Sequence, residues 1–315
     1  MKCLVAGGAG FIGSHLCDKL LAKNHKVVCV DNLLTGRKKN INHLQKEKNF
    51  TFLKWDVIKP LPNNLEVEAV FHLASPASPN KDSELSYLKH PIETLLANSI
   101  GTKNLLDLSL KCKALFLFAS TSEVYGDPKT HPQPETYWGN VNPVGIRSCY
   151  DEAKRFGESI TMAYHRKFNL DTRIIRIFNT YGPRMDPNDG RVIVNFIKQA
   201  LEEKPLTVFG DGSQTRSFCY IDDMVEGLIR AMFKTNAKGE IVNIGNPDEY
   251  SILETAKLVK DKIGTKSAIV FSPLPEDDPT RRKPDIAKAE KLLDWSPQIP
   301  LSVGLEKTIS YMKAL

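Results

Sequence analysis

The sequence lacks the paired cysteines and mixed His/Cys clusters that hold structural metals. Its six cysteines are scattered, none lies in a CxxC pair, and the seven histidines form no zinc-spaced group with them. Cys3 and Cys29 lie inside apolar runs, which is typical of small core residues. We therefore expect no metal site and a reducing, cytoplasmic environment for Cys3, Cys17, Cys29, Cys112, Cys149 and Cys219.

Long apolar runs and concentrated charge are also missing. No stretch approaches the roughly 20 apolar residues of a transmembrane helix, and a strand-like run at residue 2 leaves little room for a leader. The net charge of +6 is spread along the chain, with short basic stretches only at 37–39 and 281–283. The first stretch is typical of a solvated surface, whereas the second suits an anionic small substrate. We expect neither a membrane nor a nucleic-acid partner.

The first half of the chain alternates short apolar runs with segments of helical spacing. The strand-like runs are 2–6, 26–30, 50–55, 69–73, 114–118 and 172–177. The helical segments are 11–22, 84–110 and 150–168. Strands that alternate with helices favour an α/β fold, a doubly wound parallel sheet of Rossmann type.

A glycine-rich turn separates the first strand from the first helix. Residues 7–13 read GGAGFIG, and such a turn lets backbone N–H groups approach a pyrophosphate at the helix N-terminus. The second strand leads into Asp31, where a carboxylate can accept hydrogen bonds from an adenosine ribose. Asp31 would repel a 2′-phosphate, whereas a nearby Arg37 is the residue type that accommodates one. We favour NAD over NADP.

The amino-acid composition of the chain changes after residue 179. Loops rich in Pro, Gly and Asp appear at 181–190 and 210–212, between helical segments at 192–203, 224–233, 252–263 and 286–293. We predict that residues 1–178 form an NAD-binding domain, to which part of 214–246 returns. Residues 179–315 are expected to form mainly a smaller, interwoven substrate domain.

Tyr150 and Lys154 form a YxxxK pair on one face of a predicted helix. We expect the ammonium and the positive nicotinamide ring of a bound cofactor to lower the pKa of the phenol, so that the phenolate can take a proton from a substrate hydroxyl. Upstream, the strand at 114–118 runs into ASTSEVYG at 119–126, which places hydroxyls and Glu123 at the carboxyl edge of the sheet. Open α/β sheets bind their ligands at this edge.

The glycine turn, the hydroxyl cluster and the YxxxK pair, in this order, resemble the extended short-chain dehydrogenase/reductase family. The resemblance covers essentially the whole chain, implies bound NAD and a homodimer through 84–110 and 150–168, and places the Thr121 hydroxyl at the reacting sugar oxygen. The cofactor-binding residues expected are Gly7, Gly10, Phe11, Ile12, Gly13, Asp31, Asn32, Thr35, Gly36, Asp56, Val57, Leu73, Ser75, Ala119, Tyr150, Lys154 and Thr180.

Several segments are similar, more specifically, to UDP-glucuronate decarboxylases. They are 72–79 (HLASPASP), 121–128 (TSEVYGDP), 131–150, 178–185 (FNTYGPRM) and 281–286 (RRKPDI). Two segments depart from that pattern. Leu96-Ala97 stands where those enzymes usually carry Lys-Thr, and residues 80–89 are longer and more polar than usual.

Three positions separate decarboxylases from their relatives. Related 4,6-dehydratases carry Asp where Ser122 stands, simple 4-epimerases usually lack a carboxylate at Glu123, and Glu123 with Arg282 resembles the decarboxylase pair. The resemblance implies NAD-dependent decarboxylation of UDP-glucuronate to UDP-xylose by C4 oxidation, loss of carbon dioxide and re-reduction. The expected catalytic residues are Thr121, Glu123, Tyr150, Lys154 and Arg282.

Substrate contacts are expected from both halves of the chain. Planar guanidinium forks suit the two phosphates of UDP, and the expected set is Glu123, Asn179, Arg191, Arg216 and Arg282. The separate roles of Glu123 and Arg282 stay open, because Arg282 could hold the substrate carboxylate or orient a water. The alternatives are a UDP-sugar 4-epimerase, a decarboxylase that stops at the 4-keto product, and a non-catalytic NAD-sensing protein.

Overall fold

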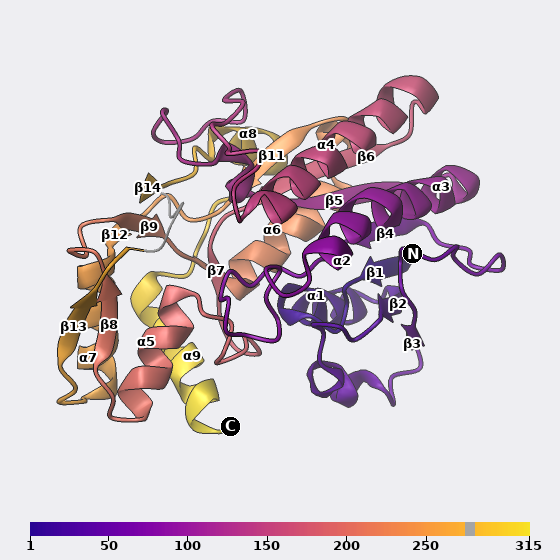
Figure 1. Ribbon diagram of the computed structural model, residues 1–315. Helices are drawn as coiled ribbons and strands as arrows, with labels where there is room; N and C mark the ends of the chain where they lie inside the picture. The colour runs from indigo at the N-terminus through magenta and orange to yellow at the C-terminus, as the bar shows by residue number, and fades with distance from the viewer. Residues whose placement is uncertain (275–280) are drawn as a thin grey trace.

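The computed structural model describes residues 1–274 and 281–315, and a seven-stranded parallel sheet forms its centre (Figure 1). The strand order is β11-β6-β5-β4-β1-β2-β3, so the winding direction switches between β1 and β4. This confirms the predicted doubly wound α/β fold. The strands are β1 (Lys2–Ala6), β2 (Lys26–Asp31), β3 (Phe50–Lys54), β4 (Ala69–His72), β5 (Leu115–Thr121), β6 (Thr172–Ile177) and β11 (Ile241–Ile244).

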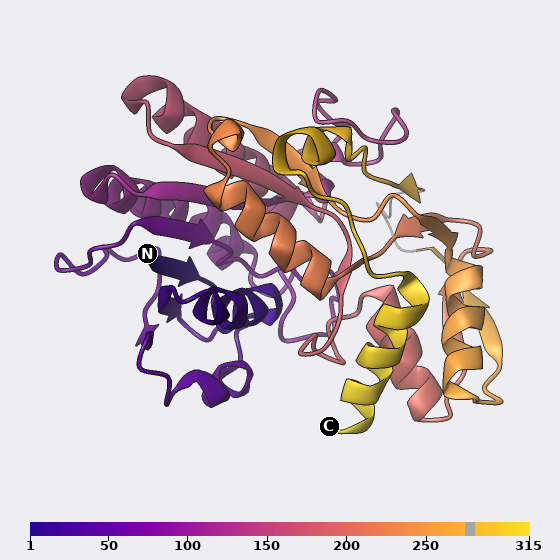
Figure 2. The same ribbon diagram turned by 180° about the vertical axis from the view of Figure 1, so that it is seen from behind.

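Helices cover both faces of this sheet, which is why its strands are almost continuously apolar. On one face α1 (Phe11–Ala22) packs against α6 (Ile221–Phe233), as Figure 2 shows from behind. On the other face lie α2 (Pro91–Leu96), α3 (Thr102–Cys112) and α4 (Ser148–Phe168). One apolar core lies between the sheet, α1 and α6 and continues into the second part, and another lies under α3 and α4.

The helix predicted over residues 84–110 is shorter and interrupted. Pro91 opens α2, because proline suits the first helical position but disfavours a helical residue before it, so residues 84–90 form turns. A π-turn, η3 (Ala97–Gly101), separates α2 from α3. The turn begins right after Leu96 and brings the Asn98 amide within 2.9 Å of the Ser75 hydroxyl.

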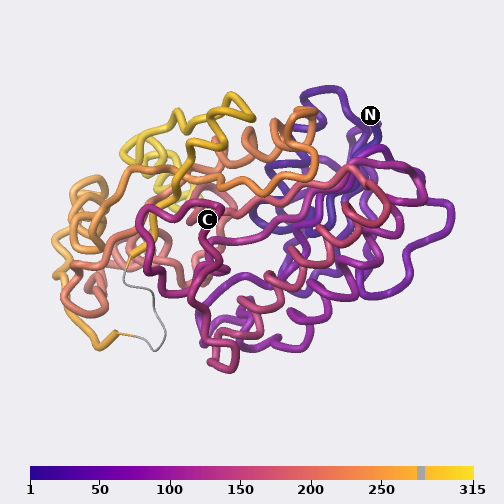
Figure 3. Tube along the Cα trace, turned by 90° about the horizontal axis from the view of Figure 1, so that it is seen from above, coloured from indigo at the N-terminus to yellow at the C-terminus, as the bar shows by residue number. Residues whose placement is uncertain are grey.

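The second part of the molecule lies beyond the carboxyl ends of the strands (Figure 1), and Figure 3 shows the two parts at opposite ends of the molecule. Its helices are α5 (Val192–Leu201), α7 (Ile252–Ile263) and α9 (Leu301–Lys313). Its strands are β7 (Thr180–Tyr181), β8 (Leu206–Phe209), β9 (Thr215–Ser217), β10 (Cys219–Tyr220), β12 (Glu249–Ser251), β13 (Ile269–Ser272) and β14 (Arg281–Arg282).

The two parts are interwoven, because α6 and β11 follow residue 179 and yet pack with the central sheet. The helix α8 (Ala287–Leu293) also packs against α6 and β11, a return that the sequence did not predict. Short helical turns complete the fold: η1 (Lys38–Asn40), η2 (Asn42–Leu44), η4 (Ser122–Tyr125) and η5 (Thr235–Ala237). In the described ranges, every helix is too short or too polar to span a bilayer.

Candidate active site

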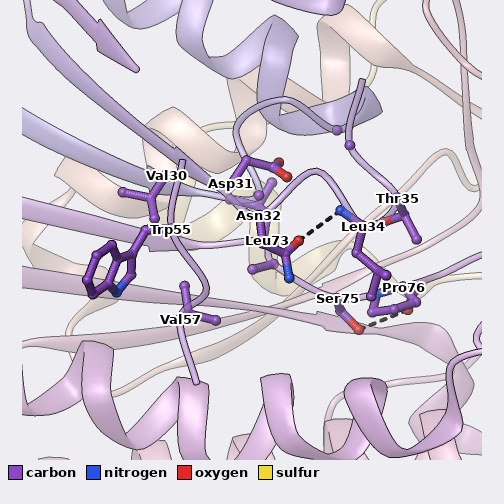
Figure 4. A pocket seen from close by; sticks show the side chains of 14 residues that line it. Val30, Asp31, Asn32, Leu34, Thr35, Trp55, Val57, Leu73, Ser75 and Pro76 are labelled. Carbon is purple, nitrogen blue, oxygen red and sulfur yellow. Dashed lines mark hydrogen bonds between the residues drawn. The ribbon is translucent and has the colours of Figure 1, made fainter. Parts of the chain in front are cut away.

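A hollow at the carboxyl ends of β1, β2 and β4 has the chemistry of an adenosine site. Figure 4 shows Val30, Trp55 and Val57 on one side and Leu34 and Thr35 on the other, with Asp31 between the two groups. Apolar walls around a single buried carboxylate suit a flat base joined to a ribose.

The glycine turn forms a cradle that no side chain could share. A Cβ at Gly13 would meet the Gly7 carbonyl oxygen at 2.1 Å, and a Cβ at Gly7, whose φ is +79°, would meet the Ala74 nitrogen at 2.7 Å. The turn and α1 therefore pack closely, and Gly10, Phe11 and Ile12 line the neighbouring cleft. The partial positive charge of the α1 N-terminus suits a pyrophosphate there.

Asp31 provides the ribose acceptor of this site. Its carboxylate accepts hydrogen bonds from the Ala9 nitrogen at 3.0 Å and the Leu33 nitrogen at 2.8 Å, which leaves further lone pairs for a ligand. Burial raises the pKa of Asp31, and these two hydrogen bonds oppose the rise. Arg37, the residue that left NADP open, forms an ion pair with Asp186 at 2.5 Å. The residues present fit NAD.

The other residues predicted to bind the cofactor line the hollow or the cleft, with one exception. Asp56 lies outside both linings. Its carboxylate accepts hydrogen bonds from the Asn32 side chain at 3.0 Å and from the Ile58 nitrogen at 3.1 Å. Asp56 therefore holds Asn32, which lines the hollow, and its direct contact with NAD stays a prediction.

A cleft of about 850 Å³ continues from the glycine turn to the second part of the molecule. Its size is that of a site for a ligand larger than one nucleotide. It brings together all the predicted catalytic and substrate-binding residues, although they are up to 161 positions apart in the chain: Thr121, Glu123, Tyr150, Lys154, Asn179, Arg191, Arg216 and Arg282.

Tyr150 and Lys154 lie on the first turns of α4, beneath the cleft. The Lys154 ammonium donates to the Ala119 carbonyl oxygen at 2.8 Å and lies 5.8 Å from the centre of the Tyr150 ring. Burial lowers the pKa of Lys154 to about 7, and Glu158 opposes this effect. The two residues are thus placed to act on one substrate hydroxyl.

The chain by itself moves the pKa of Tyr150 upward, although the sequence predicted that the Lys154 ammonium, with a nicotinamide ring, lowers it. Burial raises it to about 12, whereas the positive charge of Arg191 and a hydrogen bond with Thr121 lower it. The free-energy cost of burying the Tyr150 phenolate away from water is therefore larger than the stabilisation of the phenolate by Arg191 and Thr121. Arg191 is the leading cation acting on Tyr150, a role the sequence did not assign to it.

Glu123 follows β5 and faces two arginines. One carboxylate oxygen accepts a hydrogen bond from Arg282 and the other accepts one from Arg147 at 2.5 Å. Burial raises the pKa of Glu123, but Arg282 and then Arg147 outweigh burial and hold it well below its usual range. Sequence reasoning predicted the Arg282 partner and assigned no role to Arg147, although Arg147 lies in the segment 131–150 that is similar to UDP-glucuronate decarboxylases.

Arg191 and Arg216 reach the cleft from different elements. Arg191 lies 3.5 Å from the Asp189 carboxylate and donates to the Ala77 carbonyl oxygen at 2.6 Å. Arg216 lies on β9, directly opposite Arg282 on the parallel strand β14. Arg216, which is predicted to bind the diphosphate, therefore lies on the strand next to the one that carries Arg282, the partner of Glu123.

Tyr87 is a second site residue that sequence reasoning missed. It is 2% exposed, lines the cleft, and stacks on Tyr150 with ring centres 4.9 Å apart and planes within 10°. It belongs to the polar segment 80–89, which was noted only as a departure. A stacked aromatic neighbour of this kind restricts the orientation of the Tyr150 ring.

Residues 3–245 match the model of the NAD dependent epimerase/dehydratase family. The chain belongs to this family. NAD is the cofactor of the family, and two solved members that resemble this chain are NAD complexes. A UDP-glucuronic acid 4-epimerase from Bacillus cereus, solved with UDP-glucuronic acid and NAD, is 34% identical, with a TM-score of 0.88 over 100% of this chain and 99% of the other. A dTDP-glucose 4,6-dehydratase from Streptomyces venezuelae with NAD is 27% identical, with a TM-score of 0.90 over 100% and 97%.

Among members of the epimerase/dehydratase family, the chain is similar to UDP-glucuronic acid decarboxylases. It is 53% identical over 308 residues to UDP-glucuronic acid decarboxylase 4 of Arabidopsis thaliana, which covers 97% of this chain and 67% of the relative. It is 52% identical over 310 residues to UDP-glucuronic acid decarboxylase 1 of Danio rerio, which covers 98% of this chain and 72% of the relative.

Proposed function

We propose that this protein decarboxylates UDP-glucuronate to UDP-xylose on bound NAD. The observation that carries the proposal is the ion pair of Glu123 with Arg282 beside Thr121 and Tyr150, with Ser122 in place of a dehydratase Asp. The similarity to UDP-glucuronic acid decarboxylases over 97% of the chain supports the same substrate. A 4-epimerase is the second candidate, because a UDP-glucuronic acid 4-epimerase shares the fold.

The first step is oxidation at C4 of the sugar. Tyr150, in hydrogen-bond contact with Thr121, accepts the C4 hydroxyl proton; Arg191 favours its ionised form, and the Lys154 ammonium lies 5.8 Å from the centre of its ring. When bound, NAD⁺ would supply reversible hydride chemistry at C4, and its positive charge would oppose the rise that burial causes in the Tyr150 pKa. Gly7, Gly10 and Asp31, with the hollow around them, would hold the cofactor.

The second step is loss of carbon dioxide from C5. Once C4 is a ketone, the carboxylate is β to a carbonyl, so the C5–carboxylate bond breaks and its electron pair moves onto the C4 oxygen. Hydrogen bonds from Tyr150 and Thr121 stabilise that enolate. C5 then takes a proton and the ketone re-forms before reduction. Glu123, which its two arginines hold as a carboxylate, can orient a proton donor at C5.

The reaction can be tested directly on the purified protein. We expect UDP-glucuronate without added reductant to yield a UDP-sugar lighter by one carbon dioxide, with xylose stereochemistry by NMR and no accumulation of NADH. Unchanged mass with inverted C4 would instead identify a 4-epimerase, and NADH release would identify a 4-keto-forming decarboxylase. No reaction together with NAD binding would favour the sensor.

Tyr150→Phe provides the matched variant for this assay. Removing one hydroxyl preserves the ring stacked on Tyr87 but removes the proton acceptor. We expect turnover to fall by about a hundredfold or more while NAD content and thermal unfolding stay unchanged. Near-normal turnover would contradict the role of Tyr150.

We also propose a homodimer formed through α2 and α4, and a cytoplasmic location. Apolar side chains of Ile92, Leu95, Ile100 and Phe156 stand exposed on this face, with Ile92 60% and Phe156 50% exposed. Clustered exposed apolar side chains favour association, and a two-fold dimer is the commonest closed arrangement. All six cysteines are free, which supports a reducing compartment.

A further inference from the structure

The Glu123 carboxylate lies between two guanidinium groups that come from different parts of the chain. Arg147, at the residue before α4, donates from Nη2 to Glu123 Oε2 at 2.5 Å. Arg282, on β14, donates from Nη1 to Glu123 Oε1. Each oxygen therefore has its own arginine, and the side chain of Glu123 is only 18% exposed.

Arg282 donates to protein groups from both terminal nitrogens, whereas its buried Nε has no hydrogen-bond partner among the described residues. Its Nη1 also lies 3.4 Å from the Ser122 hydroxyl, its Nη2 donates to the Gly126 carbonyl oxygen at 2.9 Å, and the residue is 2% exposed. Nη1, which donates to Glu123 and lies near the Ser122 hydroxyl, is therefore committed to protein groups, and the donors left for a ligand are on Nε and Nη2. This favours the reading in which Glu123 and Arg282 act as one unit.

Other charged and titratable groups surround this unit. Asp151 on α4 is buried, and burial together with the charge of Glu123 raises its pKa well above the usual range. Tyr87, Tyr150 and Arg191 also interact electrostatically with Glu123. Burial disfavours the ionised form of Glu123, and Asp151 is an acidic neighbour. Arg282 supplies one positive charge that stabilises the Glu123 carboxylate, and Arg147 supplies a second.

We propose that Arg147 is a positioning residue for the steps after C4 oxidation, and that it acts by fixing the second carboxylate oxygen of Glu123 while Arg282 holds the first. This inference rests on the proposed decarboxylase function. A carboxylate fixed at both oxygens keeps one orientation and one ionisation state, so it can orient a proton donor at C5. Tyr150 and Lys154 have a different role, because they act on the hydroxyl at C4.

The test compares Arg147→Met with Arg147→Lys, Arg155→Met and the wild type, each as the NAD-loaded protein. Arg155 is the matched control, because it supports the same loop through the Val124 and Trp138 carbonyl oxygens but donates to no cleft carboxylate. After rapid mixing with UDP-glucuronate, NADH absorbance would report the rate of C4 oxidation. Quenched samples would report the amounts of carbon dioxide and UDP-xylose formed. Thermal unfolding and NAD content would report on folding.

For Arg147→Met we expect the oxidation rate to stay within about threefold of wild type while UDP-xylose formation falls about tenfold or more. NADH and 4-keto sugar should then build up. Losing one positive charge raises the Glu123 pKa, so the acidic limb of kcat should move to higher pH by about one unit. Arg147→Lys should restore most of that shift, and Arg155→Met should change neither the limb nor the NADH build-up.

A double variant makes the test sharper. If Arg147 acts through Glu123, then Arg147→Met should add almost no further loss in a Glu123→Gln background. Equal slowing of oxidation and product formation, additive losses, or wild-type behaviour of Arg147→Met would each overturn this inference. Failure of the wild type itself to release carbon dioxide would overturn the proposed function instead, so the two failures are distinguishable.

Discussion

Lys154 lies in an environment far from that of an exposed lysine in solution. It is 4% exposed, its ammonium donates to the Ala119 carbonyl oxygen at 2.8 Å, and it lies 5.0 Å above the Phe118 ring. Burial brings its pKa from 10.5 to about 7. Its charge near Tyr150 is therefore maintained at the cost of folding stability, a common arrangement at catalytic sites.

Lys154→Met should separate activity from stability. In the wild type the unfolded chain holds the Lys154 proton up to higher pH than the folded chain, so stability declines as pH falls from about 10 toward about 7. Methionine carries no proton. As the pH falls through that interval, we expect the melting temperature of the variant to rise relative to that of the wild type. Turnover should fall about a hundredfold or more.

The matched control for this experiment is Lys103→Met on α3, where the ammonium is exposed and pairs with Asp107. Its melting temperature relative to the wild type should show no such trend between about pH 7 and about 10, because the side chain is exposed. A constant difference for Lys154→Met as well would show that burial of the ammonium carries no cost of this kind.

Some residues of the site could be predicted from short sequence patterns, and others could not. Tyr150 and Lys154 share a four-residue spacing, and the cradle glycines share a seven-residue turn, so the sequence alone predicted them. The partnership of Tyr87 with Tyr150 joins positions 63 residues apart with no shared motif. Only packing of the 80–89 turns against α4 brings the two rings together.

At the scale of elements, α4 links the catalytic edge to the interior of the sheet. Glu158 on α4 accepts from Arg176 on β6 through both oxygens, at 2.9 and 2.8 Å, and from Ser120 at 2.6 Å. Arg176 also donates to the Tyr125 hydroxyl at 2.9 Å, which donates to Asn243 on β11 at 2.8 Å. Five elements, α4, β5, β6, β11 and η4, thus share one buried polar network.

Glu158→Gln should therefore destabilise the fold strongly. The neutral amide leaves the Arg176 charge buried without its counter-ion, and breaking such a pair costs about 3 kcal/mol or more in free energy of unfolding. The matched control is Glu226→Gln, whose ion pair with Arg230 is about one-third exposed and should contribute about 0.5 kcal/mol or less. Denaturant unfolding of both variants measures the difference, and equal losses would contradict the argument.

At the scale of the whole molecule, ion pairs join the two parts beside the cofactor site. Arg37, from the loop after β2, pairs with Asp186 at 2.5 Å, and Arg184 pairs with Asp18 on α1 at 2.7 Å. His15 on α1 also lies 2.9 Å from the Pro183 carbonyl oxygen. The 182–186 segment therefore rests on the nucleotide-binding half and fixes one wall of the cleft.

The proposed dimer face is tested by introducing charge. By analytical ultracentrifugation we expect a dimer for the wild type and a monomer for Phe156→Glu, because the new carboxylate would be buried against a partner's apolar surface. Val303→Glu on α9, at a side chain 41% exposed in the second part, is the matched control and should remain dimeric. Equal behaviour of the two variants would place the interface elsewhere.

The sequence by itself determined the α/β fold, the glycine cradle with Asp31, and the identity of the chemical groups at C4, because these depend on short spacings and on strand ends that a parallel sheet gathers at one edge. Tertiary structure decided the rest. It added Arg147 as a second partner of Glu123, stacked Tyr87 on Tyr150, and raised the pKa of Tyr150 through burial. Burial and long-range packing set those features, and neither is encoded in any local pattern.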